Sequence, residues 1–341
     1  MLSFAYKLPL FAGLLPRTPT VLVYHSVSRT RRPGAVDATT FEEQIVFLKR
    51  RFTFIHPQDV YRRRRLGRPA DVLLTFDDGF RNNAEVAAPI LRRYGVPAVF
   101  FICSRHSAPG KYLWCDYLRA LRQHFKGNGF TFRHEFMDMS SGQREATVRR
   151  LTAYLVQLKP HPAALYQAIE EELPRLEDFV AEAARQDEYE GMNPDQIHQL
   201  AANSLFSVGV HTVDHPRLTL CEPKEMLRQI SENKSWLEQI TSKPCGTIAY
   251  PYGDYNGETV ECCRAAGLHR GYAVLPKLRC DRDWEVPRLG IYSPSLDVLG
   301  FKVIWGRALA VDRWPRKLKS MFPIKNTQLS VERCQKRILH G

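Results

Sequence analysis

Short apolar runs alternate with amphipathic segments along most of this chain. Residues 72–76 and 98–102 are continuous apolar runs, which is typical of strands buried on both faces of a parallel sheet. The segment between them, 83–94, has helical composition and ends where Gly95 and Pro97 disfavour further helix. The expected strands are 20–23, 72–76, 98–102, 205–210, 247–250, 271–274 and 286–292, and the expected helices are 41–50, 83–94, 223–240 and 257–266.

Strands that alternate with helices across short loops predict an α/β fold with a parallel sheet and right-handed crossovers. The rhythm breaks over residues 111–202, which are mostly helical in pattern and rich in Glu, Gln, Arg and Ala. We interpret this stretch as a helical insertion on the side of a barrel, where it forms part of a cleft wall. The predicted domains are an N-terminal extension (1–19), a barrel (20–300) and a basic C-terminal extension (301–341).

The bulk composition is that of a globular protein, with 44% apolar and 25% charged residues. Eight cysteines are scattered without a Cys-x-x-Cys pair, which argues against a zinc knuckle or a disulfide scaffold and favours a reducing compartment. The apolar stretch 8–15 is too short to span a bilayer and is followed by no clear cleavage site. We therefore expect a cytoplasmic protein, with a periplasmic or secreted location as the alternative.

Positive charge is concentrated at the C-terminus. Residues 301–341 hold ten Lys or Arg against two acidic residues and contribute +8 to the net charge of +13. Aromatic residues are interleaved with these charges, a mixture that suits an anionic membrane surface and also nucleic acid. A solvated tail without a partner is the alternative. We favour peripheral association with an anionic membrane and expect no nucleic-acid partner, because the candidate chemistry points to carbohydrate.

Polar residues follow the ends of several predicted strands. His25, Asp77-Asp78, His211 and Tyr252 each lie just after an apolar run. In (β/α) barrels the carboxyl ends of the strands converge on the face that carries the active site. Residues distant in sequence are therefore expected to meet there.

Asp77 and Asp78 are adjacent carboxylates, which are costly to hold together unless a cation is near. A bound metal would resolve the repulsion, although Asp-Asp-Gly is also a turn sequence. His211 and His215 are four residues apart, a spacing that can direct two imidazoles at one metal. With Asp78 they form a two-histidine, one-carboxylate set that suits zinc and also cobalt, nickel or iron. Asp214 is interpreted as a supporting or surface residue.

The sequence Tyr250-Pro251-Tyr252-Gly253 predicts a rigid turn. Such a turn can aim a backbone N–H at a developing oxyanion. Taken alone this signal is weak, because many loops contain Pro-Tyr-Gly.

Together these motifs resemble the polysaccharide deacetylase family, also called the NodB homology or carbohydrate esterase family 4 group. Residues 75–79 (Thr-Phe-Asp-Asp-Gly) match its first motif, 211–216 (His-Thr-Val-Asp-His-Pro) its second, and 251–253 (Pro-Tyr-Gly) the end of its third. The resemblance runs from about residue 20 to 292, apart from the insertion. It implies a distorted (β/α) barrel of the NodB type and metal-dependent deacetylation.

The resemblance also implies roles for individual residues. Asp78, His211 and His215 would hold the metal, and Asp77 would be the general base. Tyr252, with Pro251 and Tyr250, would form the substrate and oxyanion turn.

The sequence departs from the usual motifs of this family at two catalytic positions. Many members carry an Arg before the Pro-Tyr-Gly turn to orient the base, but here that place is Ala249. Arg288 is the candidate replacement, with a surface or structural arginine as the equal alternative. No convincing Leu-x-His motif follows residue 292, so His25, in Val-Tyr-His on the first strand, is the candidate acid. A structural histidine that caps this strand is the alternative.

These observations predict a hydrolase that removes an N-acetyl or N-formyl group from an amino sugar in a polysaccharide or a lipid-linked glycan. Two alternatives stay open: a C–N hydrolase acting on a non-sugar amide, and a catalytically silent carbohydrate-binding relative. An iron oxygenase with the same ligand set is disfavoured, because the strand pattern is not that of a jelly roll.

Overall fold

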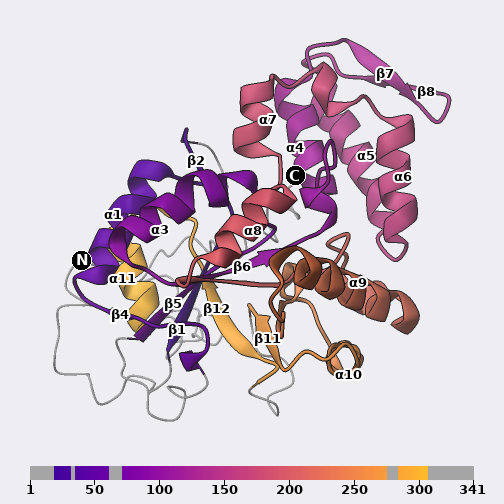
Figure 1. Ribbon diagram of the computed structural model, residues 1–341. Helices are drawn as coiled ribbons and strands as arrows, with labels where there is room; N and C mark the ends of the chain where they lie inside the picture. Colours follow the sequence, from indigo (N-terminus) through magenta and orange to yellow (C-terminus); the bar gives the residue numbers. More distant parts are fainter. Residues whose placement is uncertain (1–18, 32–34, 61–70, 275–282, 306–341) are drawn as a thin grey trace, which may run out of the picture.

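The computed structural model describes residues 19–31, 35–60, 71–274 and 283–305. A sheet of parallel strands lies at its centre (Figure 1). Seven of these strands form a closed barrel in the order β1-β12-β11-β10-β9-β6-β5, with β5 pairing back to β1. The barrel strands are β1 (Thr20–Tyr24), β5 (Asp71–Phe76), β6 (Ala98–Ile102), β9 (Phe206–Val210), β10 (Thr247–Ala249), β11 (Arg270–Ala273) and β12 (Val286–Gly290). A short strand, β4 (Thr53–Phe54), pairs with the start of β5. The predicted barrel fold is confirmed.

The apolar runs lack polar alternation because both faces of the barrel wall are buried. Leu73 and Phe101 belong to a cluster inside the barrel, whereas Leu74 and Phe100 belong to the larger core beneath the helices. Successive strand residues point to opposite faces, so one run of apolar residues serves both cores.

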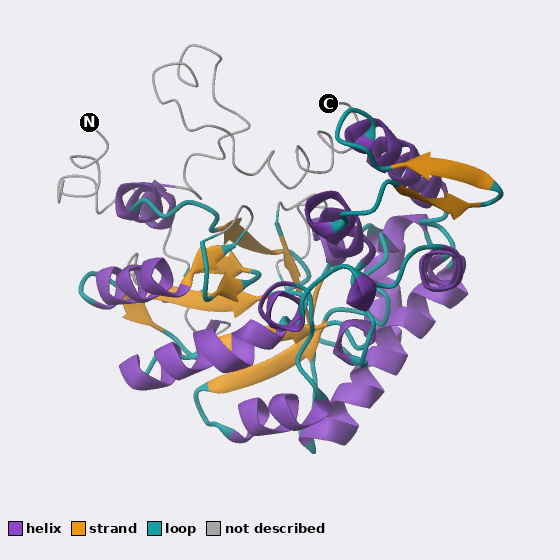
Figure 2. Ribbon diagram, turned by 90° about the horizontal axis from the view of Figure 1, so that it is seen from above, coloured by secondary structure: helices purple, strands orange, loops and turns teal. Residues whose placement is uncertain are grey.

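Helices surround this wall, as the view from above shows (Figure 2). They are α1 (Ala38–Lys49), the π-helical turn η3 (Asn83–Ala87) that continues into α3 (Ala88–Tyr94), α8 (Pro194–Ala202), α9 (Pro223–Thr241), α10 (Gly257–Ala265) and α11 (Leu296–Trp305). Asp37 caps α1 by accepting a hydrogen bond from the Thr40 N–H, and Gly95 ends α3 in the left-handed region, at φ 64°.

The segment between β6 and β9 consists of two parts with different packing. Its first part contains α4 (Trp114–His124), the hairpin β7 (Gly129–Phe132) and β8 (Glu135–Asp138), α5 (Arg144–Gln157), α6 (Pro162–Glu172), the 3₁₀ turn η5 (Leu176–Asp178) and α7 (Glu182–Glu188). These elements lie to one side of the barrel (Figure 1) and share an apolar core of their own, which includes Leu121, Leu151 and Tyr189.

The structure corrects the prediction for this segment in two respects. The insertion contains the hairpin β7–β8, which a helical pattern does not anticipate. In addition, Ile197 and Leu200 of α8 belong to the barrel core, so the last helix of 111–202 is a barrel crossover helix and not part of the insertion.

The C-terminal boundary predicted at residue 300 falls inside α11. This helix packs on α1, and the Thr20 hydroxyl donates to the buried Val303 carbonyl at 3.0 Å. The basic residues beyond 305, and the N-terminal extension up to residue 18, lie outside the described residues. Within the described ranges, no helix has both the length and the apolar character needed to cross a bilayer.

Candidate active site

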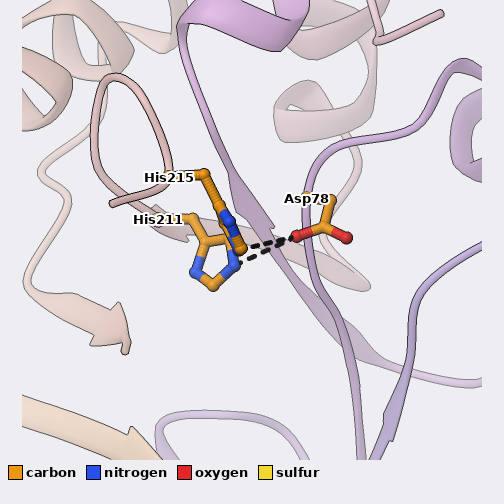
Figure 3. A group of neighbouring side chains, drawn as sticks. All are labelled: Asp78, His211 and His215. Atoms are coloured by element: carbon orange, nitrogen blue, oxygen red, sulfur yellow. Dashed lines mark ion pairs between the residues drawn. The ribbon is translucent and has the colours of Figure 1, made fainter. Parts of the chain in front are cut away.

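Three side chains meet at the carboxyl end of the barrel. Nε2 of His211 lies 3.2 Å, and Nε2 of His215 lies 3.3 Å, from Oδ1 of Asp78 (Figure 3). One potential ligand atom from each lies within 4.8 Å of the others, and all three residues are buried. The strand-end rule thus brings together residues from after β5 and after β9, which are distant in sequence.

The loops at this site contain unusual backbone conformations. Asp78, Thr212, His215 and Tyr252 all have positive φ, between 52° and 70°. Non-glycine residues seldom adopt this region, at a cost of about 1–3 kcal/mol each, and they cluster at functional sites. Gly79 has φ 78°, and a Cβ there would lie 2.8 Å from Ile102 Cγ2, so this position requires glycine.

Buried polar side chains hold the histidine loop in place. Asn233 on α9 accepts from the His211 N–H at 3.0 Å and donates to the Ile102 carbonyl at 3.1 Å. Asp214 is 5% exposed and accepts a hydrogen bond from Gln229 at 2.6 Å. The interpretation of Asp214 as a surface residue is therefore wrong, and its interpretation as a residue that supports the histidine loop fits. The sequence contained one signal of this support, namely that Gln229 and Asn233 are polar residues on the apolar face of an amphipathic helix.

The hydrogen bonds of His211 fix how its ring meets Asp78. Nδ1 lies 2.8 Å from the Ala249 carbonyl oxygen, which can only accept, so Nδ1 carries the proton. In the neutral ring, Nε2 then presents a lone pair to the Asp78 carboxylate. Asp78 Oδ1 is buried and has no hydrogen bond of good geometry within the described residues. The Nε2 lone pair and the carboxylate are both acceptors, and two acceptors that face one another are suited to bind a cation between them.

The charges at this site favour an ionised carboxylate. Burial alone would raise the pKa of Asp78, but the neighbouring His211 and His215 outweigh burial and hold this pKa well below its usual value. Burial would lower the pKa of His211, but Asp77 and Asp78 raise it overall. For His215 burial prevails and its pKa falls, as a neutral metal-ligating imidazole requires.

Asp77 is held by a buried arginine. Nη1 and Nη2 of Arg288 donate to Oδ1 and Oδ2 of Asp77 at 2.6 and 2.7 Å, and Nη1 also lies 3.2 Å from Thr75 Oγ1. Arg288 is 1% exposed, so its interpretation as a surface arginine is wrong. Burial would raise the pKa of Asp77, but Arg288 and His211 outweigh it, and the net pKa lies below the usual value.

His25 lies at the neighbouring strand end. The Asp77 N–H donates to the Tyr24 carbonyl at 3.0 Å, which brings the residue after β1 beside Asp77. The His25 ring lies 5.8 Å from the Tyr292 ring, and its Nδ1 is buried without a hydrogen-bond partner among the described residues. The side chain as a whole is half-buried.

In the Tyr-Pro-Tyr-Gly turn, Tyr250 and Pro251 are buried, whereas Tyr252 lies beside the candidate metal ligand His215. Tyr250 is 1% exposed and stacks on Tyr255 at 4.6 Å, so its side chain lies in the core and not in the cleft, and Pro251 is also buried. The Tyr252 ring lies 4.7 Å from the His215 ring. The hydrogen bonds of the turn are donated by Gly253 and Asp254, which leaves the Tyr252 N–H for another acceptor.

Two residues near the site, His106 and Trp114, were not predicted from the sequence. His106 Nδ1 lies 3.1 Å from the Asp78 carbonyl and Nε2 lies 2.7 Å from that of Tyr189, so the ring joins the Asp78 loop to the insertion. Trp114 of the insertion donates from Nε1 to the Tyr252 hydroxyl at 2.9 Å. His106 comes four residues after a predicted strand end, a signal that could have identified it. Trp114 carried no such signal.

Comparisons with known proteins show what this chain is similar to. Residues 66–271 match the family model described as polysaccharide deacetylase. The putative polysaccharide deacetylase YxkH of Bacillus subtilis (strain 168) is 25% identical over 85 residues, which are 25% of this chain and 30% of that protein. The chitooligosaccharide deacetylase of Rhizobium leguminosarum bv. phaseoli is 32% identical over 91 residues, which are 27% of this chain and 38% of that protein. The chain thus spans well under half the length of these relatives.

Two solved structures are similar in fold. The deacetylase PplD of Streptococcus pyogenes, in complex with acetate, has a TM-score of 0.50 at 18% identity, covering 83% of this chain and 97% of that one. IcaB from Ammonifex degensii has a TM-score of 0.53 at 18% identity, covering 85% and 98%. Because the family model matches more than half of the sequence, this chain belongs to the polysaccharide deacetylase family, whose members are hydrolases of carbon–nitrogen bonds.

Proposed function

We propose that this protein is a metal-dependent deacylase that hydrolyses the N-acetyl or N-formyl group of an amino sugar in a polysaccharide or a lipid-linked glycan. The observation that carries the proposal is the convergence of Asp78, His211 and His215 beside the buried Asp77–Arg288 pair. Peripheral attachment to an anionic membrane at the cytoplasmic face, through residues 301–341, belongs to the same proposal and rests on the sequence alone.

Asp78, His211 and His215 are the residues that would hold the metal. A two-histidine, one-carboxylate set leaves open positions and suits zinc first, with cobalt, nickel or iron as alternatives. When bound, such a metal supplies Lewis acidity, which lowers the pKa of water and polarises a carbonyl.

The protein's own residues would move the protons. The Asp77 carboxylate accepts a proton from water as the water oxygen adds to the acyl carbon, and Arg288 fixes the orientation of that carboxylate. The Tyr252 N–H donates to the carbonyl oxygen as negative charge develops on it. His25 donates a proton to the sugar nitrogen as the C–N bond breaks, which releases a carboxylic acid and a free amine.

The Arg288→Met variant tests whether this arginine orients the base. It leaves Asp77 buried without its cation, so the pKa of Asp77 should rise and the acid limb of the pH–rate profile should move to higher pH. Breaking a buried pair should also cost about 3–5 kcal/mol of stability. Urea unfolding and pH profiles of acyl release measure the two effects.

The Arg288→Lys variant is the matched control for Arg288→Met. It keeps the positive charge but not the two-pronged contact, so its acid limb should stay near that of the wild type while its rate falls. An unmoved acid limb in Arg288→Met, in folded protein, would show that Arg288 is only structural.

The His25→Gln variant tests the proposed acid. Loss of a general acid should lower the rate of acyl release by about 10²- to 10⁴-fold. Metal content should not change, because His25 is outside the three-residue ligand set. The loss should shrink for a synthetic N-acyl substrate whose amine leaves without protonation. Equal losses on both substrates would favour the structural role at the end of β1.

The overall proposal is tested by following both products. Purified metal-loaded protein is incubated with N-acetylated and N-formylated amino-sugar oligomers, with a lipid-linked N-acyl sugar, and with simple and cyclic non-sugar amides. We expect the released acid and the free amine to appear in equal amounts from an amino-sugar substrate, and chelation to stop the reaction. Turnover of the non-sugar amides alone would select the first alternative, and glycan binding without any product would select the silent relative.

A further inference from the structure

A small, partly open cleft lies between the insertion and the loop that carries the two histidines. The insertion contributes Trp114 and Lys159 to its lining, and the barrel contributes Asp214, His215, Arg217 and Tyr252. His215 belongs to the candidate metal set and Tyr252 to the candidate oxyanion turn. A group bound in this cleft therefore lies directly beside the proposed reaction centre.

Two cations lie over aromatic rings in this cleft. Lys159 Nζ lies 4.8 Å from the centre of the Trp114 ring and 5.9 Å from that of Tyr252. The guanidinium carbon of Arg217 lies 5.0 Å from the Tyr252 ring. A cation–π contact stabilises an ammonium only partly and occupies none of its acceptor-seeking N–H donors, so Lys159 can still bind a ligand.

The nearby carboxylates pair with arginines and not with Lys159. Asp214 contacts Arg105 and Arg228 at 3.3 Å each, and Asp254 lies 3.4 Å from Arg217. For Lys159, no carboxylate partner is found within the described ranges of the chain. Lys159 therefore keeps a positive charge in the cleft that no carboxylate of the described residues neutralises.

The half-buried Lys159 ammonium is costly to keep charged in this setting. Burial lowers its pKa, and the neighbouring Arg217 lowers it further. A ligand anion in the cleft would offset both effects, because it would replace lost hydration with charge-assisted hydrogen bonds.

We infer that this cleft is a subsite for an anionic group on the glycan substrate, bound by Lys159. The inference rests on the proposed function, because it places the anionic group beside the N-acyl group to be hydrolysed. The group is a phosphate ester or a sugar carboxylate, since both offer several acceptor oxygens to a cation. The preferred substrates are then acidic glycans or phosphate-linked sugars, and not neutral polymers.

The first experiment measures binding by calorimetry to the full-length, metal-loaded protein. The probes are glucose 1-phosphate, glucuronic acid and methyl glucoside, which lack an N-acyl group and so are not turned over. One charge-assisted contact should make an anionic probe bind about tenfold or more tightly than methyl glucoside. The phosphate and carboxylate probes distinguish the two sources of the anion.

Four proteins are compared: the wild type, Lys159→Met, Lys159→Arg and Lys126→Met. Methionine keeps an unbranched apolar stem without the charge, whereas arginine keeps the charge. Lys126 is an exposed lysine of the same insertion, beyond the opposite end of α4 from Trp114, and serves as the matched control. We expect Lys159→Met to reduce the anionic preference to within about twofold and the other two variants to retain it.

Equal binding of anionic and neutral probes to the wild type would overturn the subsite, as would an unchanged preference in Lys159→Met. The same preparations are assayed for acyl release from N-acetylated amino-sugar oligomers. If the wild type releases the acyl group but shows no anionic preference, the subsite alone is rejected. A clear anionic preference without acyl release would reject the proposed function alone.

Discussion

Replacing Asp77 by Asn should abolish acyl release while leaving the bound metal in place. The amide keeps the size of the side chain but cannot accept a proton from water at neutral pH, so the rate should fall by about 10²- to 10⁴-fold. Asp77 is not one of the three residues whose ligand atoms cluster, so metal content should stay near that of the wild type. Product release and elemental analysis on one preparation measure both effects.

The control for Asp77→Asn is stability, because Asp77 is paired with the buried Arg288. Removal of the carboxylate charge leaves that guanidinium without its counter-charge, which should lower the unfolding free energy. The rate comparison is therefore made at a temperature where the variant is folded by circular dichroism. Near-normal turnover in folded Asp77→Asn protein would contradict its role as base.

Replacing His211 by Ala should remove the metal and the activity together. The change deletes an imidazole whose orientation is fixed by the Ala249 carbonyl at 2.8 Å. Mutating even the supporting partners of metal ligands typically costs 10- to 100-fold in affinity, so loss of a ligand should weaken metal binding by about 100-fold or more. Competition with a chromophoric chelator measures this affinity.

The His198→Ala variant is the matched control for His211→Ala. His198 is exposed on α8 and bonds to the Ile240 carbonyl, away from the three ligand atoms. It should keep wild-type metal affinity and activity. If His211→Ala also kept wild-type metal affinity, the assignment of the metal centre would fail.

The location of the site could be predicted because strand direction carries that information. The runs 72–76 and 98–102 lack polar alternation, which indicated parallel strands covered on both faces. Parallel strands end on one face, so Asp77, Asp78 and His211 could be expected together before any geometry was known. The spacing of His215 from His211 then completed the three-residue group.

The contact between Arg288 and Asp77 could be suggested by the sequence but not established by it. It depends on how the barrel closes, with Val21 of β1 paired to Arg288 on one side and to Leu73 of β5 on the other. A single sequence contains no local signal for the register between strands that are neighbours in the barrel but distant in sequence. Only the missing arginine before the Pro-Tyr-Gly turn suggested that another residue must take its place.

The insertion was the least predictable part. Its helices bury their apolar faces partly against one another, in a core separate from that of the barrel, and the hairpin β7–β8 interrupts the helical pattern. The helical pattern of α8 resembles that of the insertion, although Ile197 packs on the barrel. Lys159 and Trp114 come together with Tyr252 only through this tertiary packing, so the cleft could not be read from sequence spacing.

Deacylation should require one metal, held by Asp78, His211 and His215. The most direct measurement titrates metal-stripped protein with zinc and follows bound zinc and acyl release from an amino-sugar oligomer in the same samples. Bound zinc and acyl release should rise together and reach a plateau at about one zinc per chain, as expected for a single catalytic site. Full acyl release from metal-stripped protein, or zinc binding that does not change the rate of acyl release, would contradict this requirement for a metal.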